Sequence, residues 1–208
     1  MTRPFSPCSH VEVNGVKYPY LNDDAPSVAY QRNSIAFVAQ PLQYKSEDFG
    51  VIPVPLMMTD EWEIINEDPN FVEELRSTPK DHDFNFVGQT DYAGRGVFRD
   101  LHLPRYVFQE TKPIYHLESH VKKEVLKDFL RDIAKARFVF SPRGIGSSSF
   151  RAYQSLMVGS IPIITGMNDY PFKNEVDWDS FCFRGGEGPK WSELPEKNLE
   201  EVTKLAGE

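Results

Sequence analysis

The chain is poor in cysteine. Only Cys8 and Cys182 occur among its 208 residues, and two cysteines do not make the disulfide framework that stabilises small secreted domains. We therefore expect both to be free thiols in a reducing compartment.

Long apolar runs are absent as well. No stretch approaches the roughly 20 apolar residues that a membrane-spanning helix needs, and the first residues, MTRPFSPCSHVEVNG, lack the apolar core of a secretory signal. The sequence predicts no transmembrane segment. It predicts a location in the cytoplasm or, in soluble form, at the cytosolic face of a membrane.

Basic residues are a minority. The 23 Lys and Arg residues are outnumbered by 31 Asp and Glu residues, which gives a net charge of −8, whereas a nucleic-acid-binding protein shows a basic face. We therefore do not expect nucleic acid as a partner. Hydrophobic residues make up 40% of the chain, and with its length this is enough for a sizeable globular core.

The first 80 residues are irregular and interrupted by proline, so we expect only short elements there. These are strands at residues 35–39 and 51–56 and helices at residues 60–66 and 69–76. Ser77-Thr78-Pro79-Lys80 has the composition of a linker. We place a domain boundary there, between a small N-terminal region (1–80) and a larger domain (81–208).

The larger domain shows more regular patterns. Strands are expected at residues 84–87, 114–117, 138–140 and 161–164, and helices at residues 96–108 (interrupted by Pro104), 119–136 and 149–158. The helix that begins at Ser119 has one apolar stripe, formed by Val121, Val125, Phe129, Ile133 and Ala136. The strand–helix–strand order after it is that of a parallel βαβ unit. We expect a three-layer α/β domain that binds ligands outside the carboxyl ends of its strands.

The loop SPRGIGSSS, residues 141–149, lies at such a strand end. Its glycines allow another molecule to approach the backbone closely, and its serines supply hydroxyl groups and an N-cap for the next helix. These residues are Gly144, Gly146, Ser147, Ser148 and Ser149. Unpaired N–H groups in the first helical turn carry a partial positive charge. The combination predicts a site for phosphate or diphosphate.

The distribution of charge supports an anion site. Residues 133–168 contain no Asp or Glu, and their only charged side chains are Lys135, Arg137, Arg143 and Arg151. A buried βαβ unit is poor in charge for structural reasons too. The loop is not a Walker loop, because no Gly-Lys-Ser/Thr follows, and it lacks the G-x-G-x-x-G spacing of dinucleotide-binding proteins.

Five pieces of the sequence, in order, resemble the exostosin-like glycosyltransferases. They are SPRG, SSFRAYQSL, GSIPII, YPF and VDWDSFCF. The resemblance covers roughly residues 84–183 and is strong over 138–183. It implies an inverting transferase that moves a sugar from a nucleoside-diphosphate sugar, commonly UDP-linked, to a glycan or glycoconjugate hydroxyl. It also implies a GT-B fold, with a Rossmann-like, parallel-sheet lobe for the donor and no metal cofactor.

Members of this family carry a full N-terminal acceptor lobe, and 80 residues supply only a reduced one. Either the acceptor site is small, or a partner subunit completes it, or the chain is a fragment.

The resemblance also implies roles for individual residues at the donor diphosphate. Arg143, Gly144 and Ser147–Ser149 would face the diphosphate, and Arg151 would pair with phosphate or fix the loop. Arg95 and Arg99, four residues apart on one helical face, would reach the same diphosphate and neutralise the leaving group in place of a metal; as solvated surface arginines they would have no such role.

One position departs from the family pattern. Many relatives carry an acid where this chain has Gln154, and an acid there binds the ribose hydroxyls of the donor. The Gln154 amide would hydrogen-bond the same hydroxyls without charge.

An inverting transfer needs a general base to take the proton of the acceptor hydroxyl. Asp91 is the first candidate, because it lies just beyond the strand that ends at Gly88, and His116 and Glu118 follow it.

Two Asp-x-Asp sequences resemble metal-binding motifs, which hold a divalent cation through carboxylate oxygens. Asp81-His82-Asp83 precedes its strand, which is the wrong end for a ligand site, and Asp177-Trp178-Asp179 belongs to the exostosin-like tail. We expect Asp177 to cap and Trp178 to pack, and we expect no metal site.

Two other functions remain open. A fucosyltransferase-like enzyme that uses GDP-fucose has a similar strand–helix–strand lobe, but it usually carries an acidic motif where SSFR stands here. A non-catalytic subunit that binds a nucleotide sugar or a glycan is favoured by the short N-terminal region and by Gln154.

Overall fold

The computed structural model describes residues 55–91, 95–114, 116–144, 148–167, 170–172, 175–184, 200 and 203–204, and the backbone of four short strands before them. Strand β1 (His10–Val13) pairs antiparallel with β2 (Val16–Pro19), and β3 (Ile35–Val38) pairs parallel with β4 (Gly50–Pro53). β3 and β4 lie where the sequence predicts strands. The loop residues Gly146 and Ser147 are outside the described residues.

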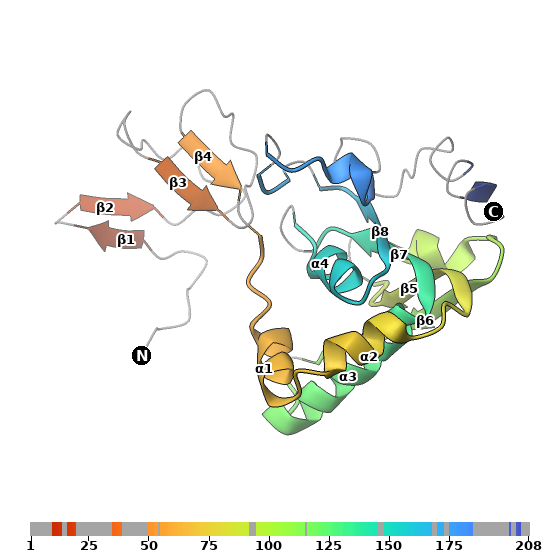
Figure 1. Cartoon of the computed structure of the whole chain (residues 1–208). Coiled ribbons are helices and arrows are strands. Elements are labelled where there is room, and N and C mark those ends of the chain that lie inside the picture. The colour runs from red at the N-terminus through yellow and green to blue at the C-terminus, as the bar shows by residue number, and fades with distance from the viewer. Residues whose placement is uncertain are drawn as a thin grey trace.

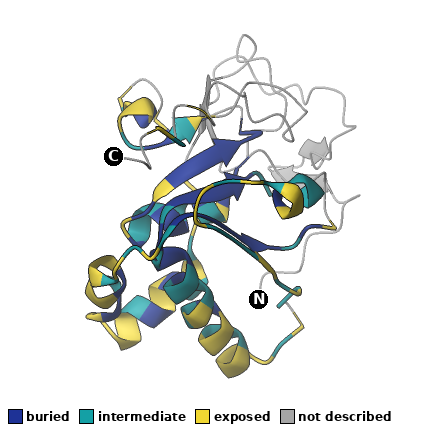
Figure 2. Ribbon diagram, turned by 90° about the vertical axis from the view of Figure 1, so that its right-hand side faces the viewer, coloured by how far each residue is buried: buried dark blue, intermediate teal, exposed yellow. Residues whose placement is uncertain are grey.

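The larger domain is built on a five-stranded parallel sheet in the order β6-β5-β7-β8-β9. Its strands are β5 (His82–Gly88), β6 (Tyr106–Glu110), β7 (Ala136–Pro142), β8 (Ile161–Thr165) and β9 (Phe183–Arg184). Strands β5, β7 and β8 are buried almost throughout, as expected for strands covered on both faces, and they form the dark-blue centre of Figure 2. The predicted α/β parallel sheet is confirmed.

Four helices lie on one face of the sheet (Figure 1). They are α1 (Thr59–Glu67), α2 (Phe71–Ser77), α3 (Ser119–Ala134) and α4 (Phe150–Met157). The core on this face joins Ile64 and Leu75 of the first two helices to Leu130 of α3 and Val139 of β7. The domain boundary at residues 77–80 stays a prediction, and α1 and α2, which precede it, pack into this core.

The other face of the sheet carries a phenylalanine core. Its buried members are Phe84, Phe86, Phe98, Phe138, Phe140 and Ile163. The described residues that cover it are the short 3-10 helix η1 (Arg95–Asp100) and the irregular segment after it. The expected helix at 96–108 is therefore wrong, and the described residues include no full helical layer on this face. Pro104 cannot continue a helix, and the aromatic and β-branched run Tyr106–Phe108 favours the strand that forms there instead.

Two further expectations need correction. The described residues of 114–117 form no strand; His116 lies in a turn that leads into α3. In α3, Val121 and Val125 are 38% and 39% exposed, whereas Leu126, Leu130 and Ile133 are buried. The buried stripe is shifted because α3 packs on α1 and α2 as well as on the sheet. Within the described part of the chain, no helix combines the length and apolar character needed to cross a bilayer.

Lys80 joins the ends of two helices at the amino edge of the sheet. Its ammonium donates to the carbonyl oxygens of Ala134 (2.8 Å) and Val158 (3.4 Å) and to the Ser160 hydroxyl (3.0 Å), although burial lowers the pKa of Lys80. These carbonyls end α3 and α4, where cations are favourable.

We expect Lys80→Met to lower the free energy of unfolding in urea by about 1–2 kcal/mol. Lys127→Met, which removes only an i,i+3 ion pair on the α3 surface, is the control and should cost well under ~1 kcal/mol; equal losses would contradict the capping role.

Candidate functional site

The sheet has a switch point between β5 and β7. The chain leaves β5 toward β6 on one side and leaves β7 toward β8 on the other, and ligands of open α/β sheets bind at the carboxyl ends of two such strands. We call this place the β5/β7 crevice. Its described residues are Gly88–Asp91, Arg143–Gly144 and Ser148–Arg151.

Arg151, in the first turn of α4, extends into this crevice. Its guanidinium carbon lies 4.8 Å from the ring centre of Phe86 and 5.8 Å from that of Phe129. Phe86 belongs to the phenylalanine core and Phe129 to α3 on the other face, so the side chain crosses the carboxyl edge of the sheet. The Nε and Nη1 atoms are buried and make no hydrogen bond to any described residue.

The electrostatic surroundings of Arg151 favour an anion. Burial, and secondarily the charge of Arg95, lower the pKa of Arg151 well below its ordinary value, to about 9. No carboxylate among the described residues forms an ion pair with it. A buried guanidinium beside a second cation is unfavourable, and a phosphate oxygen would supply both the missing charge and the missing acceptors.

The loop after β7 presents its backbone to the crevice. The Gly144 amide donates to the Ser148 carbonyl (2.8 Å), and Arg95 Nη2 donates to the Arg143 carbonyl (2.6 Å). Ser149 is the N-cap residue of α4, but its hydroxyl makes no capping hydrogen bond. The expected serine is therefore at the N-cap position, but the expected capping hydrogen bond is absent. This leaves the first amides of α4 without a side-chain cap, in the state in which helix N-termini bind anions.

Two more hydroxyl groups are buried at the same edge of the sheet. Thr165, the last residue of β8, is 1% exposed, and its Oγ1 has no partner in the described structure. Ser148 is buried beside Tyr153, whose pKa is raised by burial. A buried hydroxyl group without a protein partner is rare, so the Thr165 hydroxyl supports a polar ligand at this edge.

Arg95 and Arg99 do not share a helical face. They lie on a 3-10 helix, in which residues three apart are aligned rather than residues four apart. Arg95 points to the β7 loop, whereas Arg99 forms an ion pair with Glu110 (3.1 Å) and donates to Thr90 Oγ1 (2.8 Å). The structure thus brings Arg95, but not Arg99, to Arg143.

Gln154 is held by a residue that the sequence analysis did not single out. Its amide donates to the carboxylate of Glu61, which is in the first turn of α1 and 5% exposed. A single Glu in an acidic segment gives no sequence signal. A buried acid therefore lies beside Gln154, although position 154 itself is not acidic. It comes from α1, which precedes α4 by more than 80 residues in the chain.

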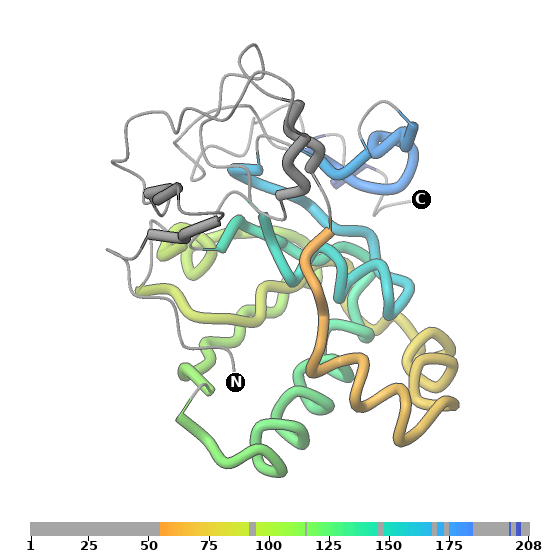
Figure 3. The backbone as a smooth tube through the Cα atoms, turned by 90° about the vertical axis from the view of Figure 1, so that its left-hand side faces the viewer, coloured from red at the N-terminus to blue at the C-terminus, as the bar shows by residue number. Residues whose placement is uncertain are grey.

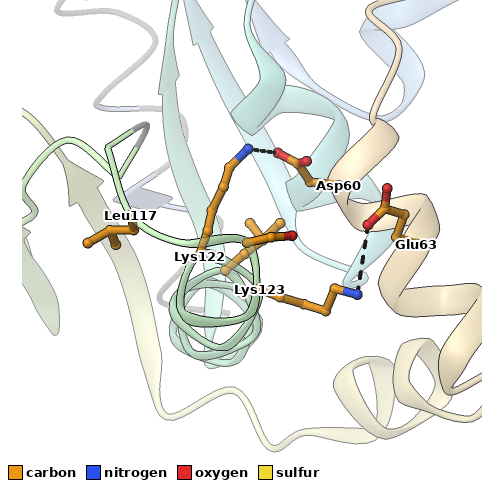
Figure 4. Close-up of a pocket in the computed structure, with 7 residues that line it drawn as sticks. Asp60, Glu63, Leu117, Lys122 and Lys123 are labelled. Atoms are coloured by element: carbon orange, nitrogen blue, oxygen red, sulfur yellow. Dashed lines mark ion pairs between the residues drawn. The ribbon is translucent and has the colours of Figure 1, made fainter.

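Ion pairs hold α1 against α3 and so place Glu61. Asp60 pairs with Lys122 (2.5 Å), and Glu63 pairs with Lys123 (3.7 Å), around a hollow of about 270 Å³ between the two helices (Figure 4). Residues 55–58 lead into α1 as an extended segment, shown in orange in Figure 3. The acidic and basic side chains that line the hollow pair with each other, so the hollow does not favour a charged ligand.

The three candidate bases lie in different places. Asp91 is exposed in the crevice, just beyond the end of β5. Glu118 is the N-cap residue of α3 and forms an exposed ion pair with His120 (3.5 Å), and His116 is exposed in the preceding turn. Of the three, Asp91 is the one that follows the carboxyl end of β5, the edge of the sheet at which the diphosphate site is predicted.

Both Asp-x-Asp sequences have structural partners. Asp83 is buried against Arg105 (3.4 Å) at the amino edge of the sheet. Asp177 accepts a hydrogen bond from the Asp179 amide at the start of η2 (Trp178–Ser180), and Trp178 Nε1 donates to the Pro171 carbonyl. The expected cap and packing are confirmed. The described residues include no group of three His, Cys, Asp or Glu side chains arranged to hold a metal ion.

No protein-family model matches the chain, and no curated protein gives a significant match.

Proposed function

We propose that this chain is a glycosyltransferase that moves a sugar from a nucleoside-diphosphate sugar, with uridine as the nucleoside, to a glycan hydroxyl, with inversion and without a metal ion. In this proposal residues 81–208, together with α1 and α2 that pack into the same core, form the donor-binding half of a GT-B architecture of exostosin type. The residues before α1 belong to a reduced acceptor region.

One observation carries the proposal. A buried guanidinium, that of Arg151, lies at the switch point of a parallel sheet with two of its nitrogens unpaired among the described residues and no acid against it. Diphosphate meets this need, because its oxygens accept two parallel N–H bonds from one guanidinium. The uncapped N-terminus of α4 and the nearby Arg95 add further positive charge.

The same groups suit the chemistry of transfer. The acceptor hydroxyl oxygen forms a bond to the anomeric carbon while the bond from that carbon to the diphosphate oxygen breaks. The diphosphate leaves with the electron pair, and Arg151 and Arg95 stabilise the charge that develops on it. The hydroxyl proton passes to Asp91, which is exposed just beyond the carboxyl end of β5.

A thermal-shift screen with UDP-, GDP- and CMP-sugars tests the proposal. Because a ligand that binds the folded state stabilises it by mass action, we expect a uridine compound to raise the melting temperature most, in the presence of EDTA as well. Arg143→Ala should lose most of that shift. Equal increases in melting temperature for all three bases would contradict the uridine assignment. If none of the compounds raised the melting temperature, the proposal as a whole would be contradicted.

Turnover separates an enzyme from a binding subunit. We expect slow release of UDP from the preferred UDP-sugar with water as acceptor, which the donor lobe supports without a glycan. Asp91→Asn should slow this release and leave the thermal shift in place. Binding without any release of UDP would instead indicate a non-catalytic module.

A further inference from the structure

Gly88 ends β5 beside Arg151, and its backbone does not explain why a glycine stands there. The described glycines with positive φ are Gly159 and Gly166, so Gly88 has the ordinary conformation of a strand. A residue with a side chain would adopt this backbone without strain.

The space around Gly88 is what requires a glycine. A Cβ atom at this position would lie 2.3 Å from Nη2 of Arg151 and 3.0 Å from its Cζ. Both distances are shorter than the roughly 3.5–4.0 Å at which non-bonded heavy atoms make van der Waals contact. Residue 88 and the guanidinium therefore occupy the same slot, and the slot admits Arg151 only when residue 88 has no side chain.

The backbone of Gly88 is fixed, so a side chain here would have to push the guanidinium of Arg151 away. The Thr111 amide donates to the Gly88 carbonyl (3.1 Å), and Gly88 pairs with Glu110 in the sheet, so the strand is held in place. On the other side, the guanidinium lies over the rings of Phe86 and Phe129. A methyl group at position 88 would displace the guanidinium from this slot.

We infer that Gly88 is a positioning residue for anion binding: it keeps open the slot through which Arg151 reaches the β5/β7 crevice. This inference rests on the proposed function, since it assigns Gly88 a role through Arg151. Gly88 itself touches no substrate.

The test compares Gly88→Ala with Gly96→Ala, a matched control whose Cβ would meet no atom within 4 Å. Pyrophosphate binding is measured by titration calorimetry, and stability by urea denaturation. We expect Gly88→Ala to fold and to bind pyrophosphate about tenfold more weakly, whereas Gly96→Ala binds it like the wild type. Gly88→Ala should also lower the urea midpoint in the wild type but not in Arg151→Ala, where the slot is empty.

The outcomes are distinguishable. Wild-type affinity in Gly88→Ala, or the same loss of urea midpoint with and without the Arg151 side chain, would overturn the positioning role. If Arg151→Ala binds pyrophosphate as the wild type does, the proposed function fails first, and the role of Gly88 fails with it.

Discussion

Replacing Arg151 with methionine is expected to weaken pyrophosphate binding at least a hundredfold and, in the absence of ligand, to make the protein more stable. The affinity falls because two charge-assisted hydrogen bonds are lost, each worth about 1.5–3 kcal/mol. The stability rises because an uncompensated buried charge is removed, and an unbranched thioether packs well against Phe86 and Phe129. We expect a gain of about 2 kcal/mol in the free energy of unfolding, measured by urea denaturation alongside calorimetry.

The pH dependence of this gain has a definite sign. The pKa of Arg151 is lowered to about 9 in the folded protein, well below its ordinary value, so the folded state releases this proton first as the pH rises. Below pH 9 both states are protonated and the charge destabilises the fold fully. As the pH rises above 9 this penalty is relieved. The stability advantage of Arg151→Met should be constant at pH 7–8 and should narrow above pH 9.

The control for this variant is Arg131→Met. Arg131 also lies over a phenylalanine ring, that of Phe71, at 5.3 Å, but it is partly exposed and pairs with Asp128 (3.0 Å) on the α3 surface. Its replacement should leave pyrophosphate affinity unchanged and should not stabilise the protein. The anion site would be refuted if Arg151→Met bound pyrophosphate normally, or if it were less stable than the wild type without ligand.

Glu61→Gln is expected to weaken UDP binding by tenfold to a hundredfold while leaving pyrophosphate binding unchanged or slightly tighter. This expectation assigns the ribose of the nucleotide to Glu61, which accepts a hydrogen bond from Gln154. Gln154 follows Arg151 by three residues, about 4.5 Å along α4, and helical side chains lean toward the N-terminus. A carboxylate accepts both hydroxyls of a diol, and bonds to a charged group are worth about 1.5–3 kcal/mol.

Calorimetry with UDP, 2′-deoxy-UDP and pyrophosphate checks this expectation. The wild type should prefer UDP over its deoxy analogue, and Glu61→Gln should lose that preference. Glu63→Gln is the control: it removes a neighbouring charge that pairs with Lys123, and this variant should keep the preference for UDP over 2′-deoxy-UDP. No preference in the wild type would contradict the ribose contact, and an equal loss of UDP and pyrophosphate in Glu61→Gln would show that Glu61 acts only through the fold.

Local pattern was enough to predict the central part of the fold. The strands at 138–140 and 161–164 and the helix at 149–158 are present as β7, β8 and α4, because apolar strands and an amphipathic helix leave strong signals over short distances. The same pattern failed between residues 96 and 117. There the phenylalanine face of the sheet favours a 3-10 turn and a strand at residues whose spacing alone suggests a helix.

The site was predicted in part. The loop at residues 141–149 and Arg151 come from one continuous stretch, and the structure places both at the switch point. Arg99 was expected there too, but it pairs with Glu110, a residue on the neighbouring strand. The sequence contains both residues and gives no indication that they meet.

By itself the sequence determined the parallel sheet, the helices on either side of the loop at residues 141–149, and the absence of Asp and Glu from residues 133–168. Each of these depends on neighbours within about one helix or strand. Only the tertiary structure decided which polar groups are paired. Glu61 reaches Gln154, Arg99 reaches Glu110, and Gly88 leaves its space to Arg151. Each of these contacts joins segments brought together by packing, and burial is what makes an unpaired charge such as Arg151 costly enough to indicate a ligand.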